Sequence, residues 1–507
     1  MFNVIFISPV SLTIEILNDF PYFSEAFDVY LNNQKVKENI TTNVVSIYDL
    51  EPNTKYEIKI NDEIKTIETP NVEKVYIMKD LTSEYKGIVS PIIQRTLDEA
   101  PKNSLLVFDS GDYHILPLII RSNLTIYLKK GARLIAETNR NLFPILNKEN
   151  FPGEYILPSW EGEIAPNYLS IISILDAKNI NFVGEGTIDG NAQNSDWWIN
   201  HKIMRGAWRP HNIFIDNSEH INFQGVRVMN SPSWTIHPYY SSNLGFYDLE
   251  IINPKDSPNT DGLNPESSNM VEIIGVKFNV GDDCIAIKSG KIDMAEINFA
   301  PSQNITIRNC FMGDGHGGVV LGSEMSCGIK NLDISKCYFK GTDRGLRIKT
   351  RRGRGDKAIV DNVVFQNIYM DEVLNPLVIN MFYFCDDDGK TEYVYSKEKL
   401  PVDKRTPYLG SFYFKNIECH NTIISSGYFY GLPEMKIKKI SLENVTIDFM
   451  NTDIYGYPAM MSYIDKVNRF GLYFNNVEKV ELKNVKIINQ VGEKCYLNNV
   501  DKIMEEE

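Results

Sequence analysis

Along most of the chain a polar residue, usually Asn, stands before an apolar-polar-apolar triplet, and through the middle of the chain this unit returns about every 23 to 35 residues. Clear copies lie at residues 179–182, 220–223, 243–246, 269–273, 304–307, 331–334, 362–365, 439–442 and 479–482. The two-residue period stacks apolar side chains of successive units inward, while Asn residues form hydrogen-bonded ladders. The pattern predicts a parallel β-helix. A leucine-rich horseshoe fits less well because Leu is not dominant, and a propeller would show longer, more uniform repeats.

Residues 1–70 have a different pattern, with short alternating strands separated by Asn, Asp and Pro. Tyr56 follows a Pro-Asn turn, as in a tyrosine corner at the edge of a sandwich, although the turn is also compatible with a simple edge strand. The segment resembles a fibronectin type III domain. We therefore predict an all-β chain with a small β-sandwich at 1–70 and a β-helix at 71–507, with one amphipathic helix at 90–99.

Composition narrows the classes of function. The 507 residues are 43% hydrophobic and carry a formal net charge of −14, which argues against a nucleic-acid partner. No apolar run is long enough to span a bilayer and no signal peptide is recognisable, so we expect no membrane partner and a cytoplasmic protein. The seven cysteines are scattered without metal-ligand spacing, which predicts reduced, mostly buried thiols and no metal or other cofactor. The oligomeric state stays open.

Four short motifs carry candidate chemistry. They are residues 259–262 (Asn-Thr-Asp-Gly), 281–284 (Gly-Asp-Asp-Cys), 315–318 (Gly-His-Gly-Gly) and 347–349 (Arg-Ile-Lys). Asp261 precedes Asp282 by 21 residues, about one coil of a β-helix, so Asp261 is expected beside the Asp282-Asp283 pair. Like charges that close raise at least one pKa, which separates an acid from a base. Hydrolysis of a glycosidic bond needs such a pair.

Each motif also has a simpler interpretation. Asp261 suits a turn, an Asp pair is often a solvated turn, and a lone His such as His316 is usually structural. The apolar strand 284–287 directly after the Asp pair favours the site, and the glycines around His316 allow a close approach. In residues 347–349 the period of two places both cations on one face, suited to a carboxylate ligand. The later arginines at 351, 352 and 354 are better explained as an exposed basic strand.

The four motifs in this order resemble glycoside hydrolase family 28, the polygalacturonase family, over residues 71–490. The resemblance implies a right-handed parallel β-helix and hydrolysis with inversion. It implies that Asp282 is the general acid and that Asp261 and Asp283 hold and deprotonate the attacking water, in shares left open. It also implies that His316 keeps the acid correctly protonated.

For substrate binding, the resemblance implies that Arg347 and Lys349 clamp a galacturonate carboxylate, with Asn259 and Gly317 also at the substrate. The expected partner is an oligogalacturonide or pectin chain. The segments 147–168 and 382–410 exceed what a coil needs and suit loops that close one end of a cleft, as in exo-acting bacterial members that attack the non-reducing end.

Several alternatives remain at this stage. Within the family they are endo-action and hydrolysis of decorated rhamnogalacturonan or xylogalacturonan. Outside it they are a Ca²⁺-dependent pectate lyase, which cleaves by elimination, and a non-catalytic carbohydrate-binding β-helix.

Overall fold

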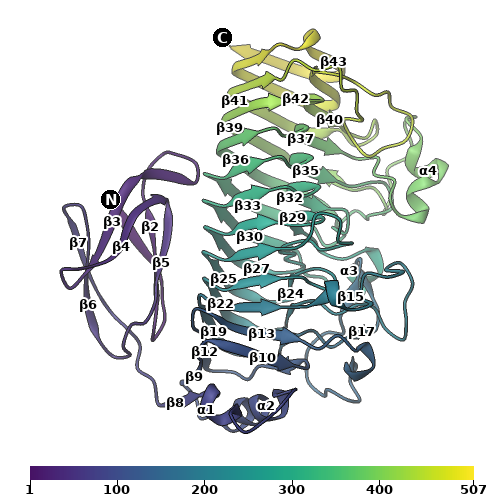
Figure 1. Ribbon diagram of the computed structural model, residues 1–507. Helices are drawn as coiled ribbons and strands as arrows, with labels where there is room; N and C mark the ends of the chain where they lie inside the picture. Colours follow the sequence, from purple (N-terminus) through teal and green to yellow (C-terminus); the bar gives the residue numbers. More distant parts are fainter. Residues whose placement is uncertain (507) are drawn as a thin grey trace.

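The protein is described by a computed structural model that covers residues 1–506. Figure 1 shows a small sandwich lying beside one flank of a long stack of strands. In the sandwich, one antiparallel sheet holds β1 (Phe2–Ile7), β2 (Leu12–Ile16) and β5 (Val44–Ile47). The other holds β4 (Gln34–Thr42), β3 (Phe23–Leu31), β6 (Lys55–Ile60) and β7 (Glu63–Glu68).

The remaining strands form a parallel β-helix of three stacks, which confirms the predicted architecture. The first stack contains β8 (Lys74–Ile77), β9 (Ser104–Phe108), β12 (Leu124–Leu128), β19 (Lys178–Gly184), β22 (Glu219–Gln224), β25 (Ser242–Tyr247), β27 (Asn269–Ile274), β30 (Ser302–Arg308), β33 (Ile329–Ser335), β36 (Ile359–Asp371), β38 (Tyr408–Leu409), β39 (Ser411–Thr422), β41 (Ile437–Phe449), β42 (Phe470–Ile488) and β43 (Val491–Glu506). The second contains β10 (Gly111–Ile115), β13 (Ala132–Ala136), β20 (Thr187–Asp189), β23 (Arg227–Met229), β26 (Glu250–Ile252), β28 (Lys277–Asn279), β31 (Phe311–Gly313) and β34 (Tyr338–Lys340), and continues into β36.

The third stack carries the motifs. It runs through β11 (Leu118–Ile119), β18 (Ile172–Leu175), β21 (Ile213–Asp216), β24 (Ile236–Tyr239), β29 (Asp283–Ile287), β32 (Gly317–Gly322), β35 (Arg344–Lys349), β37 (Asn375–Asn380) and β40 (Ser425–Tyr430), and continues into β42. Leu263 forms single bridges to Ile236 and to Ile285, which joins β24 to β29 through the motif at 259–262. Two small hairpins lie outside the stacks: β14 (Ile145–Leu146) with β17 (Asn167–Tyr168), and β15 (Ser159–Trp160) with β16 (Glu163–Ile164).

Helices are few and short. They are α1 (Met78–Thr82), α2 (Ser90–Glu99), α3 (Ile292–Ile297) and α4 (Glu392–Tyr395), with single 3-10 turns η1 (Arg140–Leu142), η2 (Ala192–Asn194) and η3 (Asp387–Lys390). The predicted helix at 90–99 is confirmed as α2. It has Pro in its first turn, where no donor is needed, and it buries Ile93 and Leu97 against the end of the β-helix.

The repeat explains both the core and the turns of the β-helix. Successive inward rings stack, as at Phe182 and Phe223, whose centroids are 4.9 Å apart. Near the start of the strands of the first stack the Asn side chains form the predicted ladder, in which each amide donates to the Asn of the preceding coil at 2.9 to 3.1 Å. Its members are Asn269, Asn304, Asn331 and Asn362. The side chains therefore satisfy one another along the axis.

Within the sandwich, the hydroxyl of Tyr56 accepts a hydrogen bond from the backbone N–H of Glu51 at 2.8 Å. This is the contact that a tyrosine corner requires. The sandwich core is separate from that of the β-helix. The large sheet begins at Lys74, and the predicted domain boundary at residue 70 stays a prediction.

Polar side chains fix the sandwich to the β-helix. Glu15 receives two hydrogen bonds from Arg308, at 2.6 and 2.9 Å, and one from Asn309 at 2.8 Å. Ser11 donates to Gln224 at 2.5 Å. Because Glu15 is buried, loss of this contact would leave an uncompensated buried charge.

Among residues 1–506 no helix is long and apolar enough to cross a membrane. All seven cysteines are free thiols, five of them buried, with Cys385 exposed and Cys495 half-buried.

Candidate active site

The coil geometry brings the three aspartates of the motifs together. The backbone N–H of Gly262 donates to the carbonyl of Asp283 at 2.9 Å, so Asp261 lies one coil before Asp283. On the other side, Asp283 is in register with Gly317 of β32. The predicted stacking of Asp261 beside the Asp282-Asp283 pair is therefore seen in the structure.

Asp261 is a buried carboxyl group without a cationic hydrogen-bond partner among residues 1–506. Its residue is 4% exposed, and its Oδ2 accepts a hydrogen bond from the side-chain amide of Asn264 at 2.9 Å. Burial raises its pKa well above the ordinary value, and the charges of Asp282 and Asp283 raise it further. Asp261 is therefore the member of the cluster that most readily holds a proton.

Asp283 is equally buried but has cationic partners. Its Oδ2 accepts a hydrogen bond from Lys349 Nζ at 3.0 Å, and its Oδ1 lies 3.8 Å from a guanidinium nitrogen of Arg347. Burial alone would raise the pKa of Asp283, but Lys349 and then Arg347 lower it below the ordinary value. Oδ1 has no hydrogen-bond partner among residues 1–506, so this ionised carboxylate has a free acceptor.

Asp282 is the most accessible of the three carboxyl groups, with a side chain 28% exposed. Its Oδ1 lies 3.6 Å from Nδ1 of His316, and the backbone N–H of His316 donates to its carbonyl at 3.1 Å. The interaction with the Asp282 carboxyl group raises the pKa of His316, against the opposing effect of burial. His316 is itself 58% exposed, so this pair forms the solvent-facing edge of the cluster.

The structure also places the four residues expected to bind substrate. Arg347 and Lys349 lie on one face of β35 with Ile348 in the core, and both turn toward Asp283. A Cβ at Gly317 would lie 3.0 Å from Asp283 Oδ1 and 2.4 Å from a Val320 methyl group, so a side chain there would crowd the carboxylate.

Asn259 contacts Arg209, a residue that no motif in the sequence indicated. Its side-chain oxygen accepts a hydrogen bond from Arg209 at 2.7 Å, and Arg209 also donates to the carbonyls of Pro232 and Pro258. Arg209 is 3% exposed and forms no ion pair within residues 1–506. Burial lowers its pKa to about 10. Arg209 therefore ties the turn before Asp261 to the preceding coil.

A second unforeseen contact is the buried ion pair between Lys288 and Glu324, whose Nζ and Oε2 are 3.0 Å apart. Burial opposes the charge of Lys288, but Glu324 and then Asp261 raise its pKa above the ordinary value. Lys288 directly follows the strand 284–287, and the two-residue alternation of a strand places its side chain outward. This is the one sequence signal that could have identified it.

Below this pair lies a buried chain of hydrogen bonds. His211 Nδ1 meets Ser233 Oγ at 3.0 Å, His211 Nε2 meets His237 Nδ1 at 3.2 Å, and His237 Nε2 meets Glu266 Oε2 at 2.9 Å. Burial lowers the pKa of His237 to about 3 and raises that of Glu266 to about 7. Ser233 donates to the carbonyl of Pro210, so its oxygen accepts the hydrogen bond from His211. All hydrogen bonds of the uncharged chain are then formed when Glu266 is protonated and its O–H donates a hydrogen bond to His237.

The segment 147–168 reaches this layer through the β15–β16 hairpin. Ser159 Oγ donates to Glu266 Oε2 at 3.0 Å. The ring of Trp160 stacks on Trp208 with centroids 4.6 Å apart and lies 6.3 Å from Trp234. The hairpin thus covers the coils immediately before the three aspartates.

The segment 382–410 forms the other border and corrects one expectation. Arg351, Arg352 and Arg354 were expected on an exposed strand, but they are only 1%, 1% and 3% exposed. Arg351 and Arg354 each donate to Asp386 at 2.7 Å, and Arg352 forms two hydrogen bonds with Glu434. Arg351 and Arg354 therefore anchor the long segment through Asp386, and Arg352 anchors it by donating to the carbonyls of Tyr393 and Ser396, a role that the charge run itself does not reveal.

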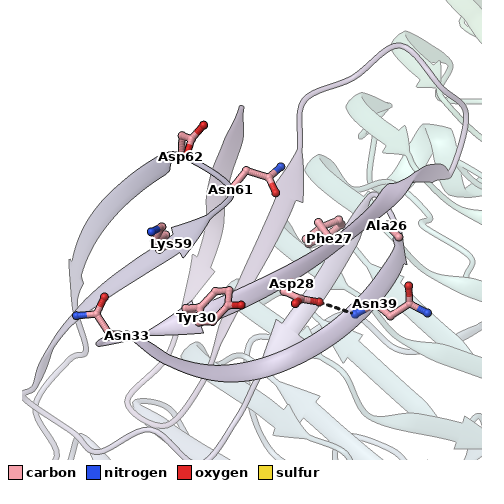
Figure 2. A pocket seen from close by; sticks show the side chains of 9 residues that line it. All are labelled: Ala26, Phe27, Asp28, Tyr30, Asn33, Asn39, Lys59, Asn61 and Asp62. Atoms are coloured by element: carbon pink, nitrogen blue, oxygen red, sulfur yellow. Dashed lines mark hydrogen bonds between the residues drawn. The ribbon is translucent and has the colours of Figure 1, made fainter.

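Another hollow of the molecule lies elsewhere. Figure 2 shows a polar hollow of about 850 Å³ on the sandwich, bordered by Asp28, Tyr30, Asn39 and Lys59. None of its lining residues belongs to the four motifs. Charge, burial and motif order all mark the aspartate cluster instead, so we take the cluster as the site. Among residues 1–506 no group of three or more His, Cys, Asp or Glu side chains is placed to hold a metal ion.

Comparison with known proteins gives consistent results. Residues 158–397 match the family described as glycosyl hydrolases family 28. A probable polygalacturonase of Vitis vinifera is 33% identical over 335 residues, which are 65% of this chain and 63% of that protein. An endo-polygalacturonase of Pectobacterium parmentieri is 28% identical over 306 residues, 57% of this chain and 71% of that protein. The chain spans less than two thirds of the length of the Vitis vinifera relative.

Two solved structures share the fold. The family 28 exopolygalacturonase of Yersinia enterocolitica superimposes with a TM-score of 0.75 at 17% identity, covering 100% of this chain and 99% of its own. A hyperthermoactive exopolygalacturonase of Thermotoga maritima gives 0.62 at 23% identity, covering 75% and 88%.

Proposed function

Because residues 158–397 place this chain in glycosyl hydrolases family 28, we propose that it is a polygalacturonase, which hydrolyses α-1,4-galacturonosyl linkages of polygalacturonate and oligogalacturonides. The observation that carries the proposal is that the carboxyl groups have different surroundings, which raise the pKa of Asp261 and lower that of Asp283. Asp283 is held ionised by Lys349 and Arg347, while Asp282 is the accessible member and lies beside His316.

In the proposed reaction, Asp282 gives its proton to the leaving oxygen as the glycosidic bond breaks. A water molecule attacks the anomeric carbon from the opposite face and passes its proton to Asp283, so the configuration inverts. Asp261, whose pKa is raised by burial and by its acidic neighbours, holds a proton and orients the water by hydrogen bonding. This division assigns the base to Asp283, a point that the sequence left open.

The substrate carboxylate is assigned to Arg347 and Lys349. These two cations share the single carboxylate of Asp283, so one positive charge at the site lacks a full counterion. A galacturonate carboxylate would complete the balance, and guanidinium and ammonium groups are suited to it. A net charge of −14 makes this local balance necessary for binding a polyanion.

We further propose exo-action from the non-reducing end. The proposal is supported by the β15–β16 hairpin, which packs over the coils before the aspartates, and by the stacked Trp160 and Trp208. The N-terminal sandwich is proposed to be a fibronectin type III-like module that is fixed to the β-helix, on the basis of its two antiparallel sheets and the Tyr56 corner.

The test is a time course of products from polygalacturonate, run with and without a chelator. Reducing ends, ultraviolet absorbance and chain length are measured together. We expect mono- or digalacturonate from the first minutes and no ultraviolet-absorbing product. A ladder of mixed oligomers would keep the hydrolase and remove exo-action, whereas an unsaturated product abolished by the chelator would establish a lyase. Absence of any product would leave decorated pectins or a binding protein.

A further inference from the structure

The tip of the β15–β16 hairpin has an unusual backbone. The two strands are joined by Glu161 and Gly162, with φ of 50° and 79°. A two-residue hairpin loop favours positive φ, and Gly, Asn or Asp usually occupy such positions. A Glu at positive φ carries a steric cost that Gly avoids, so the contacts of the hairpin must hold this turn in place.

The tip is anchored by its backbone, so the position of Glu161 is well determined. The backbone N–H of Lys291 donates to the carbonyl of Gly162 at 3.1 Å. A Cβ at Gly162 would lie 2.7 Å from Cγ of Glu324, so only Gly allows this close approach to the Lys288–Glu324 pair. The hairpin therefore rests directly on the layer that borders the aspartates.

The carboxyl group of Glu161 has no partner in this position. It is half-buried and takes part in no hydrogen bond or ion pair within residues 1–506. Burial and then the charge of Glu324 raise its pKa, and Lys288 partly offsets this effect. Carboxylate oxygens accept hydrogen bonds, so a half-buried carboxylate without a partner in the described part of the chain, close to Glu324 and Lys288, leaves acceptor capacity for a ligand donor.

We infer that Glu161 determines specificity by ending the cleft, where it accepts hydrogen bonds from hydroxyl groups of the non-reducing terminal sugar. This inference rests on the proposed function. Hydroxyls are the matching donors, because the neighbouring Glu324 makes a second anion unfavourable beside Glu161 and because Arg347 and Lys349 are already assigned to a sugar carboxylate. Trp160 directly precedes the tip and is buried and stacked on Trp208, so packed side chains support the tip.

Two substitutions test the inference without disturbing the turn. Glu161→Gly and Glu161→Asn both suit positive φ, so the hairpin should fold, and both remove the carboxyl group, with Asn leaving a shorter, uncharged amide. The matched control is Glu163→Gln, which changes the other, exposed glutamate of the same hairpin. We expect kcat/KM on trigalacturonate to fall about 10- to 100-fold in both Glu161 variants, the usual effect of losing hydrogen bonds to a charged group, and to stay within about twofold in the control.

The decisive readout is discrimination at the terminal hydroxyl. A 4,5-unsaturated trigalacturonide lacks the C4 hydroxyl of its non-reducing terminal sugar. We expect the wild-type enzyme to prefer the saturated trimer by at least about 10-fold, and Glu161→Gly to lose this preference. Equal discrimination and equal kcat/KM in the wild type and Glu161→Gly would overturn the inference while the hydrolase stands. No product from the wild type would refute the proposed function together with the inference.

Discussion

Lys349→Met isolates the contact that keeps Asp283 ionised. Lys349 Nζ lies 3.0 Å from Asp283 Oδ2, and the two side chains are 11% and 2% exposed. Met has a similar length and fills the space without a charge. After the change Arg347, at 3.8 Å, is the main cation that offsets the burial of Asp283, with a smaller effect from Lys288.

The expected cost can be worked out from this geometry. Removing one partner of a buried ion pair costs roughly 3–5 kcal/mol, and the remaining Arg347 favours the lower end, about 3 kcal/mol at neutral pH. In the wild type the pKa of Asp283 is lowered, so its stabilising effect is present above the unfolded pKa of about 3.9 and is lost as pH falls through the folded pKa.

In Lys349→Met the sign reverses, because burial then dominates and raises the folded pKa of Asp283 above its unfolded value. The penalty should therefore grow with pH, by about 1.4 kcal/mol per unit, between the unfolded pKa and the raised folded pKa. The variant should be much closer to the wild type at pH 5 than at pH 8.

The assay is urea unfolding at pH 5 and pH 8, followed by tryptophan fluorescence. All five tryptophans lie in the β-helix, so the signal reports on that part of the chain. Lys130→Met, at an exposed lysine, is the control for removal of a positive charge. In an Asp283→Asn background, Lys349→Met should cost far less than in the wild type. Equal penalties at both pH values, or in both backgrounds, would refute the reasoning.

Three further changes have defined outcomes. His316→Gln should lower kcat/KM and remove the alkaline limb of its pH profile. The interaction with Asp282 raises the pKa of His316 above the ordinary imidazole value of about 6.5, so the limb should lie above that pH. An unchanged limb would show that this imidazole does not cause it. Glu15→Gln should weaken the packing of the sandwich on the β-helix by about 3 kcal/mol, because it breaks the ion pair with Arg308. The expected readout is faster proteolysis of residues 1–70. Gly162→Ala should lower the melting temperature and the activity together, because its Cβ would lie 2.7 Å from an acidic side chain at positive φ, and a fully stable variant would contradict the packing described.

Much of the fold was predictable because each repeat of the β-helix is recognisable within a short stretch of sequence. Apolar alternation and recurrent Asn predicted the stacked strands and the ladder through Asn304 and Asn331, and the spacing of Asp261 and Asp282 predicted their meeting. One coil advances the chain by a fixed step along the axis, so sequence distance converts directly into neighbours.

The lateral contacts were not predictable in this way. Arg209, Glu161 and the Lys288–Glu324 pair meet the site through loops whose paths depend on packing and not on a repeat. The same limit explains the error at Arg352, where a charge run that reads as a solvated face is buried against Glu434. Charged residues are rarely buried without a partner, and the partner lies 82 residues away along the chain.

The central claim is that Asp282 donates the proton in a hydrolytic cleavage. Asp282→Asn tests it most directly, with release of reducing ends from polygalacturonate and binding of trigalacturonate by calorimetry measured on the same preparations. The account predicts a loss of about 10²- to 10⁴-fold in kcat with binding retained, since the substitution removes the proton and keeps the shape. Unchanged release of reducing ends by Asp282→Asn would contradict it.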